Sequence, residues 1–254
     1  MSELPASVRL ALWTTAAWRG DLALADAIER SFPGVDHVSG LGPTLQAWGD
    51  IGERALLVAL PSPGRLEGMP RCAPAVAGHA AQAGECLHVA GVGGMLVPTL
   101  SEYGPSGDTG VRVDWTAYEA EPVPRHRLEM LDLRQAEREL LERMRGHADR
   151  LEAVGGQPWE RAVRAEAETG LRHSLWGLPE QVPGPTLRVM ATAALVSQAA
   201  GRGRSLTALG SHGPDAMTTD RREALLRSLA ADADRALAEA TNVAVMVLAG
   251  WRPA

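Results

Sequence analysis

The chain has 254 residues, of which 45% are hydrophobic, and a net charge of −6 at pH 7. This length and apolar content suffice for one large domain or two small ones, and they exclude a disordered protein. The acidic balance argues against a general nucleic-acid-binding surface, because phosphate binding needs clustered positive charge. The chain contains no lysine, since all 25 residues counted as lysine or arginine are arginine. Schiff-base chemistry on a lysine and a phosphate-loop lysine are therefore excluded.

Residue types with codons rich in A and T are scarce throughout the chain, with a single Asn and a single Phe. This composition is typical of a GC-rich bacterial genome and accounts for the missing lysine. No apolar run approaches the roughly 20 residues that span a bilayer. Glu3 stands where a secretory signal would carry a positive charge. We therefore expect a cytoplasmic protein that does not contact membranes.

The first 124 residues predict an α+β arrangement. We expect helices over residues 6–18, 21–31, 43–48 and 74–83, and strands over residues 55–61, 85–91, 94–101 and 111–118. Gly20 separates the first two helices, and Asp21 is the expected N-cap of the second. In the last strand Val113 and Trp115 alternate with polar residues, which predicts one buried face. Together these segments predict a small, mainly antiparallel sheet of four or five strands.

After residue 124 the pattern is helical. We expect helices over residues 128–154, 158–171 and 185–200, and a last helix from about residue 219. Glu139 and Arg143 have the i,i+4 spacing of a stabilising pair, and Gly201 is the expected end of the third helix. Residues 243–251 are apolar on every side, and the sequence leaves open whether they form buried helix, strand or a subunit interface. The predicted fold class is α+β, with an α+β half (1–124) and a helical half (125–254) packed as one cooperative unit.

Four possible zinc ligands lie within seventeen residues: Cys72, His79, Cys86 and His88. Their spacing matches no common zinc module, and each residue type has an ordinary structural use. The sequence does not decide whether the four converge, and we expect neither a metal nor a cofactor. Residues 91–94 (Gly-Val-Gly-Gly) follow a strand but do not open a helix, which favours a hairpin connection over a phosphate-binding loop.

A candidate ligand site combines Arg172 and His173, at the end of one predicted helix, with Arg188 near the start of another. An arginine on an otherwise apolar helix needs a carboxylate, a carbonyl or a ligand as its partner. The alternative is an internal ion pair, for example with an acid of the 128–154 helix. The sequence contains no recognisable catalytic motif, so whether the protein is an enzyme is left open.

Several turn and packing motifs resemble a family of proteins from high-GC actinobacteria with no assigned activity. The motifs are L-V-A-L-P-S-P-G (57–64), A-G-E (83–85), L-R-H-S (171–174) and L-P-E-Q-V-P-G-P (178–185). The resemblance extends loosely over residues 7–250 and implies no reaction.

Two classes of function follow. The first is a non-enzymatic interaction or regulatory protein, whose partner is another protein or a second copy of the chain in a homodimer. The alternative is a protein or enzyme that binds a small anionic ligand through the Arg172, His173 and Arg188 cluster.

Overall fold

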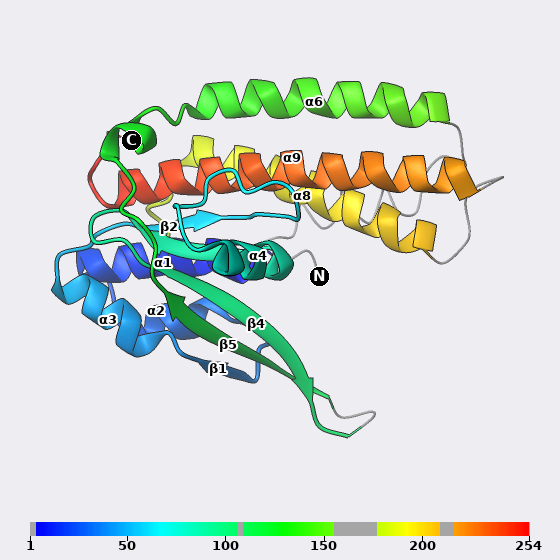
Figure 1. Ribbon diagram of the computed structural model, residues 1–254. Coiled ribbons are helices and arrows are strands. Elements are labelled where there is room, and N and C mark those ends of the chain that lie inside the picture. The colour runs from blue at the N-terminus through cyan, green and yellow to red at the C-terminus, as the bar shows by residue number, and fades with distance from the viewer. Residues whose placement is uncertain (1–3, 106–108, 155–176, 209–215, 254) are drawn as a thin grey trace.

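The computed structural model describes residues 4–105, 109–154, 177–208 and 216–253. The fold is α+β, as the sequence predicts: a sheet and short helices occupy the first half, and long helices the second (Figure 1). The helices are α1 (Ala6–Arg19), α2 (Leu24–Ser31), α3 (Gly42–Asp50), α4 (Pro74–Ala83), α5 (Arg125–Glu129), α6 (Leu133–Val154), α8 (Gly184–Ala208) and α9 (Ala216–Leu248). The strands are β1 (His37–Ser39), β2 (Leu56–Ala59), β3 (Cys86–Val89), β4 (Met95–Tyr103) and β5 (Gly110–Tyr118).

The five strands form one sheet in the order β1-β5-β4-β3-β2. All neighbours are antiparallel except β1, which pairs in parallel with β5. β4 and β5 pair from Met95 opposite Tyr118 to Tyr103 opposite Gly110, so their hairpin extends well beyond the other strands (Figure 1). β2 lies at the opposite edge, where it is covered by the helical half.

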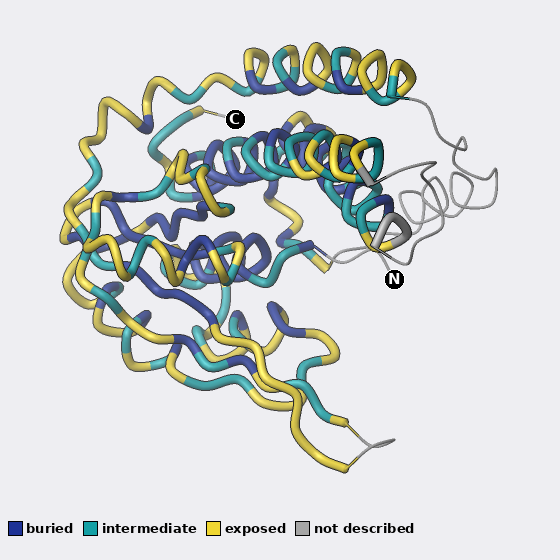
Figure 2. The backbone as a smooth tube through the Cα atoms, turned by 45° about the vertical axis from the view of Figure 1, so that its right-hand side comes forward, coloured by how far each residue is buried: buried dark blue, intermediate teal, exposed yellow. Residues whose placement is uncertain are grey.

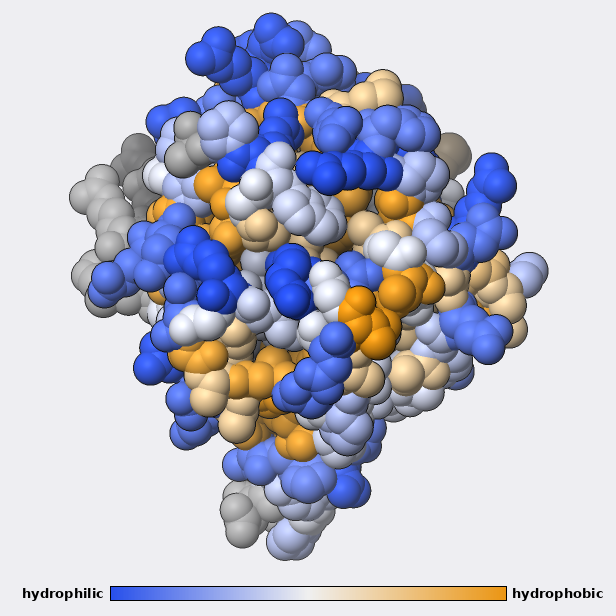
Figure 3. Space-filling view, turned by 90° about the vertical axis from the view of Figure 1, so that its left-hand side faces the viewer, coloured by the Kyte–Doolittle hydropathy of each residue, from blue (hydrophilic) through white to orange (hydrophobic). Residues whose placement is uncertain are grey.

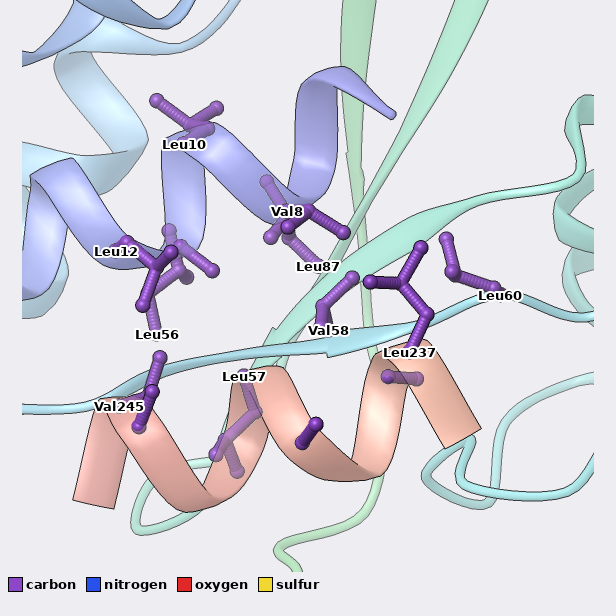
Figure 4. Close-up of a cluster of buried hydrophobic side chains, with 14 of the residues drawn as sticks. Val8, Leu10, Leu12, Leu56, Leu57, Val58, Leu60, Leu87, Leu237 and Val245 are labelled. Carbon is purple, nitrogen blue, oxygen red and sulfur yellow. The ribbon is translucent and has the colours of Figure 1, made fainter. Parts of the chain in front are cut away.

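The main core lies around β2, which runs between α1 and α9 (Figure 4). Leu56 is next to Leu12 of α1, whereas Leu57 lies over α9 (Figure 4). Both leucines are fully buried, because alternate strand residues point to opposite sides and a helix covers each side. The sheet is therefore buried on both faces in this region.

A smaller core fills the space between α4 and the sheet. Ala80 of α4 packs there with Cys86, Met95 and Val97. The Pro- and Gly-rich loop 60–73 leads from β2 to α4. This loop forms one wall of the site described below.

The start of α1 is held by an acid from another part of the chain. α1 has no side-chain N-cap of its own, but a carboxylate oxygen of Glu85 accepts a hydrogen bond from the backbone N–H of Ser7 (2.8 Å). A carboxylate at a helix N-terminus satisfies a free N–H and complements the helix dipole. Glu85 precedes β3 directly, so this contact fixes α1 against the sheet.

The helical half is layered, with α8 and α9 side by side next to the sheet and α6 outside them (Figure 1). The inner face of α6 is buried and its outer face exposed (Figure 2). Its buried residues are Ala136, Leu140 and His147, and Leu133 and Met144 also pack against the main core. Apolar contacts and ion pairs to α9 therefore both attach α6.

The predicted connection over residues 91–94 is confirmed, because it joins the antiparallel strands β3 and β4. Gly93 has φ of +75°, and a Cβ there would lie 2.2 Å from the carbonyl oxygen of Ala120. The turn therefore requires glycine for its shape and its close packing.

Three local predictions are wrong. α8 continues past Gly201 to Ala208, because packing against α9 offsets the roughly 1 kcal/mol cost of a helical glycine. α2 begins at Leu24 and is preceded by Ala23, so Asp21 is not its N-cap; Asp21 pairs with Arg19 instead. Glu139 and Arg143 do not pair with each other, because each pairs with a residue of α9: Glu139 with Arg235 and Arg143 with Asp232. The helix predicted over 158–171 lies outside the described residues.

Candidate functional site

A cavity of about 190 Å³ lies beside α9, between the end of β2, the loop 60–73 and the segment 123–131. Part of its wall is apolar, with side chains that include Val58, Leu60, Met69 and Leu128. Its charged or titratable lining residues are Arg65, Glu67, His88, Arg127, Arg235 and Glu239. A cavity that combines an apolar wall with a few charged groups is the usual form of a small-molecule site.

Asn242 fixes α9 at this cavity. Its side-chain oxygen accepts a hydrogen bond from the backbone N–H of Val58 (2.8 Å), and its amide nitrogen donates to the carbonyl oxygen of the same residue (2.9 Å). β2 is the edge strand of the sheet, so this side chain takes the place of a neighbouring strand. The two bonds hold one wall of the cavity rigid.

His88 lies in β3 and is fully buried at the cavity wall. Its Nε2 donates to the carbonyl oxygen of Gly68 (3.3 Å), which ties the loop 60–73 to the sheet. Its Nδ1 has no hydrogen-bond partner among the described residues. Burial lowers the pKa of His88 to about 4, because an apolar environment disfavours the charged ring. His88 is therefore neutral at pH 7.

Behind Arg65 the carboxylate of Asp232 binds three cationic or donor groups. Its side chain is 2% exposed, and it contacts Arg65 Nη2 at 2.7 Å and Arg143 Nη1 at 3.3 Å. His147 of α6 donates to its second oxygen (2.9 Å). Burial alone raises the pKa of Asp232, but the hydrogen bonds from His147 and Arg65 and the charges of Arg65 and Arg143 outweigh it and lower the pKa. The loop, α6 and α9 thus meet at one ionised carboxylate.

Arg235, one helical turn after Asp232, is shared between two acids. It makes a close ion pair with Glu139 of α6 and a longer one with Glu239, where Nε and Oε1 are 3.6 Å apart. Burial raises the pKa of Glu239, and the neighbouring Glu139 raises it further, whereas the charges of Arg235 and Arg143 lower it without cancelling the rise. The cavity therefore contains a carboxylate whose charge is incompletely balanced.

Arg127 is the third arginine of the cavity. It lies on the short helix α5 and is exposed. Among the described residues it has no ion-pair partner. Its guanidinium group is thus available to an anionic group that enters the cavity.

The structure places the predicted ligand site only in part. Arg188 lies near the start of α8 with 66% of its side chain exposed, and its Nε is 3.5 Å from a carboxylate oxygen of Glu137 in α6. This is the internal ion pair that the sequence offers as the alternative. Arg172 and His173 lie outside the described residues, so their role in a site stays a prediction.

The four possible zinc ligands are placed in different surroundings. Cys86 and His88 are buried in β3, whereas His79 is exposed on α4 and contacts the hydroxyl of Tyr118 (3.1 Å). Burial raises the pKa of the Cys86 thiol, which disfavours the thiolate that a metal needs. Within the ranges that the structure describes, no three His, Cys, Asp or Glu side chains are grouped as a metal site.

The apolar turns at the end of α9 are part of the chain's own core. Val243 to Met246 and Leu248 are buried against β2 and α1 in the main cluster. The question that the sequence leaves open is therefore decided for the helical residues in favour of buried helix. No helix in the described part of the chain is both long enough and apolar enough to cross a membrane.

A second hollow lies at the end of the molecule that carries the C-terminus, lined by residues that include Ile51, Val92 and Trp251. Figure 3 shows the corresponding face, where apolar patches are interrupted by hydrophilic side chains. Extensive protein interfaces are usually built around a continuous apolar centre. We therefore regard the enclosed cavity beside α9 as the better candidate site.

The sequence interpretation overlooked most of this site. One signal was present: Asn242 is the single asparagine of the chain and stands at the start of the apolar run VAVMVL. An amide in such a run needs buried hydrogen-bond partners. No comparable signal marks Arg65 or Arg127, which lie in polar connecting segments.

Two family comparisons cover nearly the whole chain. Residues 7–129 match the family described as Rv1486c-like protein, N-terminal domain, and residues 134–249 match Rv1486c-like protein, C-terminal domain. No curated protein and no solved structure matches the chain. The resemblance to a family without assigned activity is thereby confirmed, and the chain belongs to the family of Rv1486c-like proteins.

Proposed function

We propose that this protein binds a small molecule with an anionic group in the cavity beside α9. The observation that carries the proposal is the combination, in one partly enclosed space, of an apolar wall with the guanidinium groups of Arg65, Arg127 and Arg235. This is the second of the two functions that the sequence suggests, with the binding site moved away from Arg188.

The charge of the cavity supports an anionic group on the ligand. Three arginines face two glutamates, Glu67 and Glu239, and the neutral His88 adds no charge at pH 7. Charged hydrogen bonds in a partly enclosed space are stronger than those on an open surface. Arg65 and Arg235 are already paired with acids, so an incoming carboxylate or phosphate has Arg127 as its unpaired cation among the described residues.

The volume limits the size of the ligand. An apolar cavity of about 150 Å³ holds one benzene molecule, so a cavity of about 190 Å³ accepts a molecule of on the order of ten non-hydrogen atoms.

The test is a thermal-shift screen of small carboxylates, phosphates and amino acids against the full chain and two variants. Ala231→Trp fills the cavity from α9, and Ala224→Trp places the same side chain on an exposed position of the same helix. A ligand at a hundred times its dissociation constant contributes about 2.7 kcal/mol, which raises the midpoint by several degrees in a chain of this size.

We expect at least one compound to stabilise the wild type and Ala224→Trp but not Ala231→Trp. A flat screen, or a shift that Ala231→Trp retains, contradicts the proposal. Retention of the shift would place binding elsewhere on the protein, for example at the predicted Arg172 and His173.

A further inference from the structure

Some arginines of the cavity already form ion pairs with acids of the protein, and one does not. Arg65 is paired with Asp232, and Arg235 is paired with Glu139 and Glu239. Arg127 has no ion pair within the described part of the chain. The cation that the cavity can offer to a ligand without breaking an existing pair is therefore Arg127.

The cavity also offers a negative group. The side chain of Glu239 is 30% exposed. Within the described residues its ion pair is with Arg235 at 3.6 Å, and the charge of Arg143 also acts on it. Arg235 contacts Glu139 more closely, so the two carboxylates share its guanidinium group, and Arg143 acts on both from a greater distance. A cationic group of a ligand beside Glu239 would stabilise its ionised form, because a nearby positive charge stabilises a partly buried carboxylate.

Arg127 and Glu239 line the same cavity and form no ion pair with each other within the described structure. A ligand with one positive and one negative group can bridge the two side chains. A simple anion would instead bring a second negative charge close to Glu239 and would supply no cation to pair with it. The remaining wall, which includes Leu60, Met69 and Leu128, is apolar. Burial of an aliphatic group there contributes roughly 25 cal/mol per Å².

We propose that the ligand is a small apolar zwitterion, with a carboxylate that binds Arg127, an ammonium group that binds Glu239 and an aliphatic side chain on the apolar wall. An α-amino acid of the size of leucine has these three parts and about the right volume. This inference rests on the proposed function, since it names the chemical class of the ligand for the same cavity.

The experiment compares L-leucine with two analogues that each lack one charged group, by isothermal titration calorimetry at pH 7.5. L-leucine carries both charges, 4-methylpentanoate lacks the ammonium group, and 3-methylbutylamine lacks the carboxylate. We expect L-leucine to bind at least about tenfold more tightly than either analogue, because each analogue loses a hydrogen bond between charged groups worth about 1.5 kcal/mol or more.

Two variants then separate the ends of the ligand. Arg127→Gln should weaken L-leucine and 4-methylpentanoate about tenfold and leave 3-methylbutylamine unchanged. Glu239→Gln should weaken L-leucine and 3-methylbutylamine but improve 4-methylpentanoate, since it removes a like charge. Arg125→Gln, on the same helix but outside this cavity, is the matched control and should change none of the three.

Each outcome has a defined meaning. If 4-methylpentanoate binds as tightly as L-leucine and Glu239→Gln has no effect, the ligand is a plain anion, so the zwitterion inference is wrong while the proposed function stands. If none of the three probes binds, but Ala231→Trp abolishes the shift caused by another compound of the screen, the zwitterion inference is again wrong and the proposed function stands. If no compound responds to Ala231→Trp in either experiment, both proposals fail.

Discussion

The two halves of α9 are attached to the protein by different interactions. From Leu237 to Leu248 the helix is buried among apolar side chains of β2 and α1. Just before this stretch, Asp232 and Arg235 attach α6 and the loop 60–73 through ion pairs. Apolar burial depends little on pH or salt, whereas a charge network depends on both. The cavity lies where the two kinds of attachment meet, which gives it both an apolar wall and charged groups.

The largest effect is expected in the apolar half. Leu237→Ala removes a fully buried side chain and should lower the free energy of unfolding by about 3 kcal/mol. Urea denaturation at pH 7.5 measures the change, and it should be the same in 1 M NaCl. Leu141→Ala, at an exposed position of α6, is the control and should cost far less. Equal losses for the two variants would mean that this half of α9 is not the core.

The second effect concerns the one buried histidine of the cavity. The pKa of His88 is about 4 in the folded protein, against an ordinary value of 6.5. Between these values the unfolded chain takes up a proton that the folded chain does not, so stability falls as pH drops from 6.5 towards 4. By pH 5 this amounts to about 2 kcal/mol. His88→Gln should flatten that slope in urea denaturation curves, whatever its cost at pH 7.5; an unchanged slope would show that another group causes the acid sensitivity.

A smaller effect is expected from the charge network. Asp232→Asn removes the carboxylate shared by Arg65, Arg143 and His147 and should cost about 1.5 kcal/mol at pH 7, because two of the three partners stay partly exposed to water. The pKa of Asp232 is lowered by folding, so its contribution is complete above about pH 4 and is lost as pH falls below that value. The difference between wild type and variant should therefore shrink in acid.

Asp149→Asn, an exposed acid of α6, is the control for Asp232→Asn and should have little effect at any pH. A loss for Asp232→Asn that stays constant down to pH 2 would mean that the carboxylate acts by its shape and not by its charge.

The smallest effect is expected at the exposed pair of Arg188 and Glu137. Arg188→Gln should change the free energy of unfolding by less than about 0.5 kcal/mol, because surface ion pairs are screened by water and salt. Glu137→Gln should give the same small change. A loss above about 1 kcal/mol in either variant would show that Arg188 has a further partner, and would support its prediction as a site residue.

Regular elements of this protein could be predicted from local patterns, and the site could not. The alternation of Val113 and Trp115 and the turn glycines around residue 93 gave the sheet and its hairpin correctly. Glu139 and Arg143 show the limit, since their i,i+4 spacing predicts a local pair that α9 replaces with two long-range ones. Arg65 and Asp232 are separated by 167 residues, and no local pattern connects residues so far apart.

By itself, the sequence determined the α+β class, the order of most helices and strands, the absence of lysine chemistry and the resemblance to a family. These follow from periodicity, turn residues and composition, which act over a few residues or over the whole chain. The tertiary structure alone decided that the apolar end of α9 is core, that Arg188 faces Glu137, and that Arg65, Arg127, Arg235 and Glu239 line one cavity. Charged side chains can satisfy their charge with many partners at similar cost, so only the packing of α9 against β2, α6 and the loop 60–73 selects which of them meet.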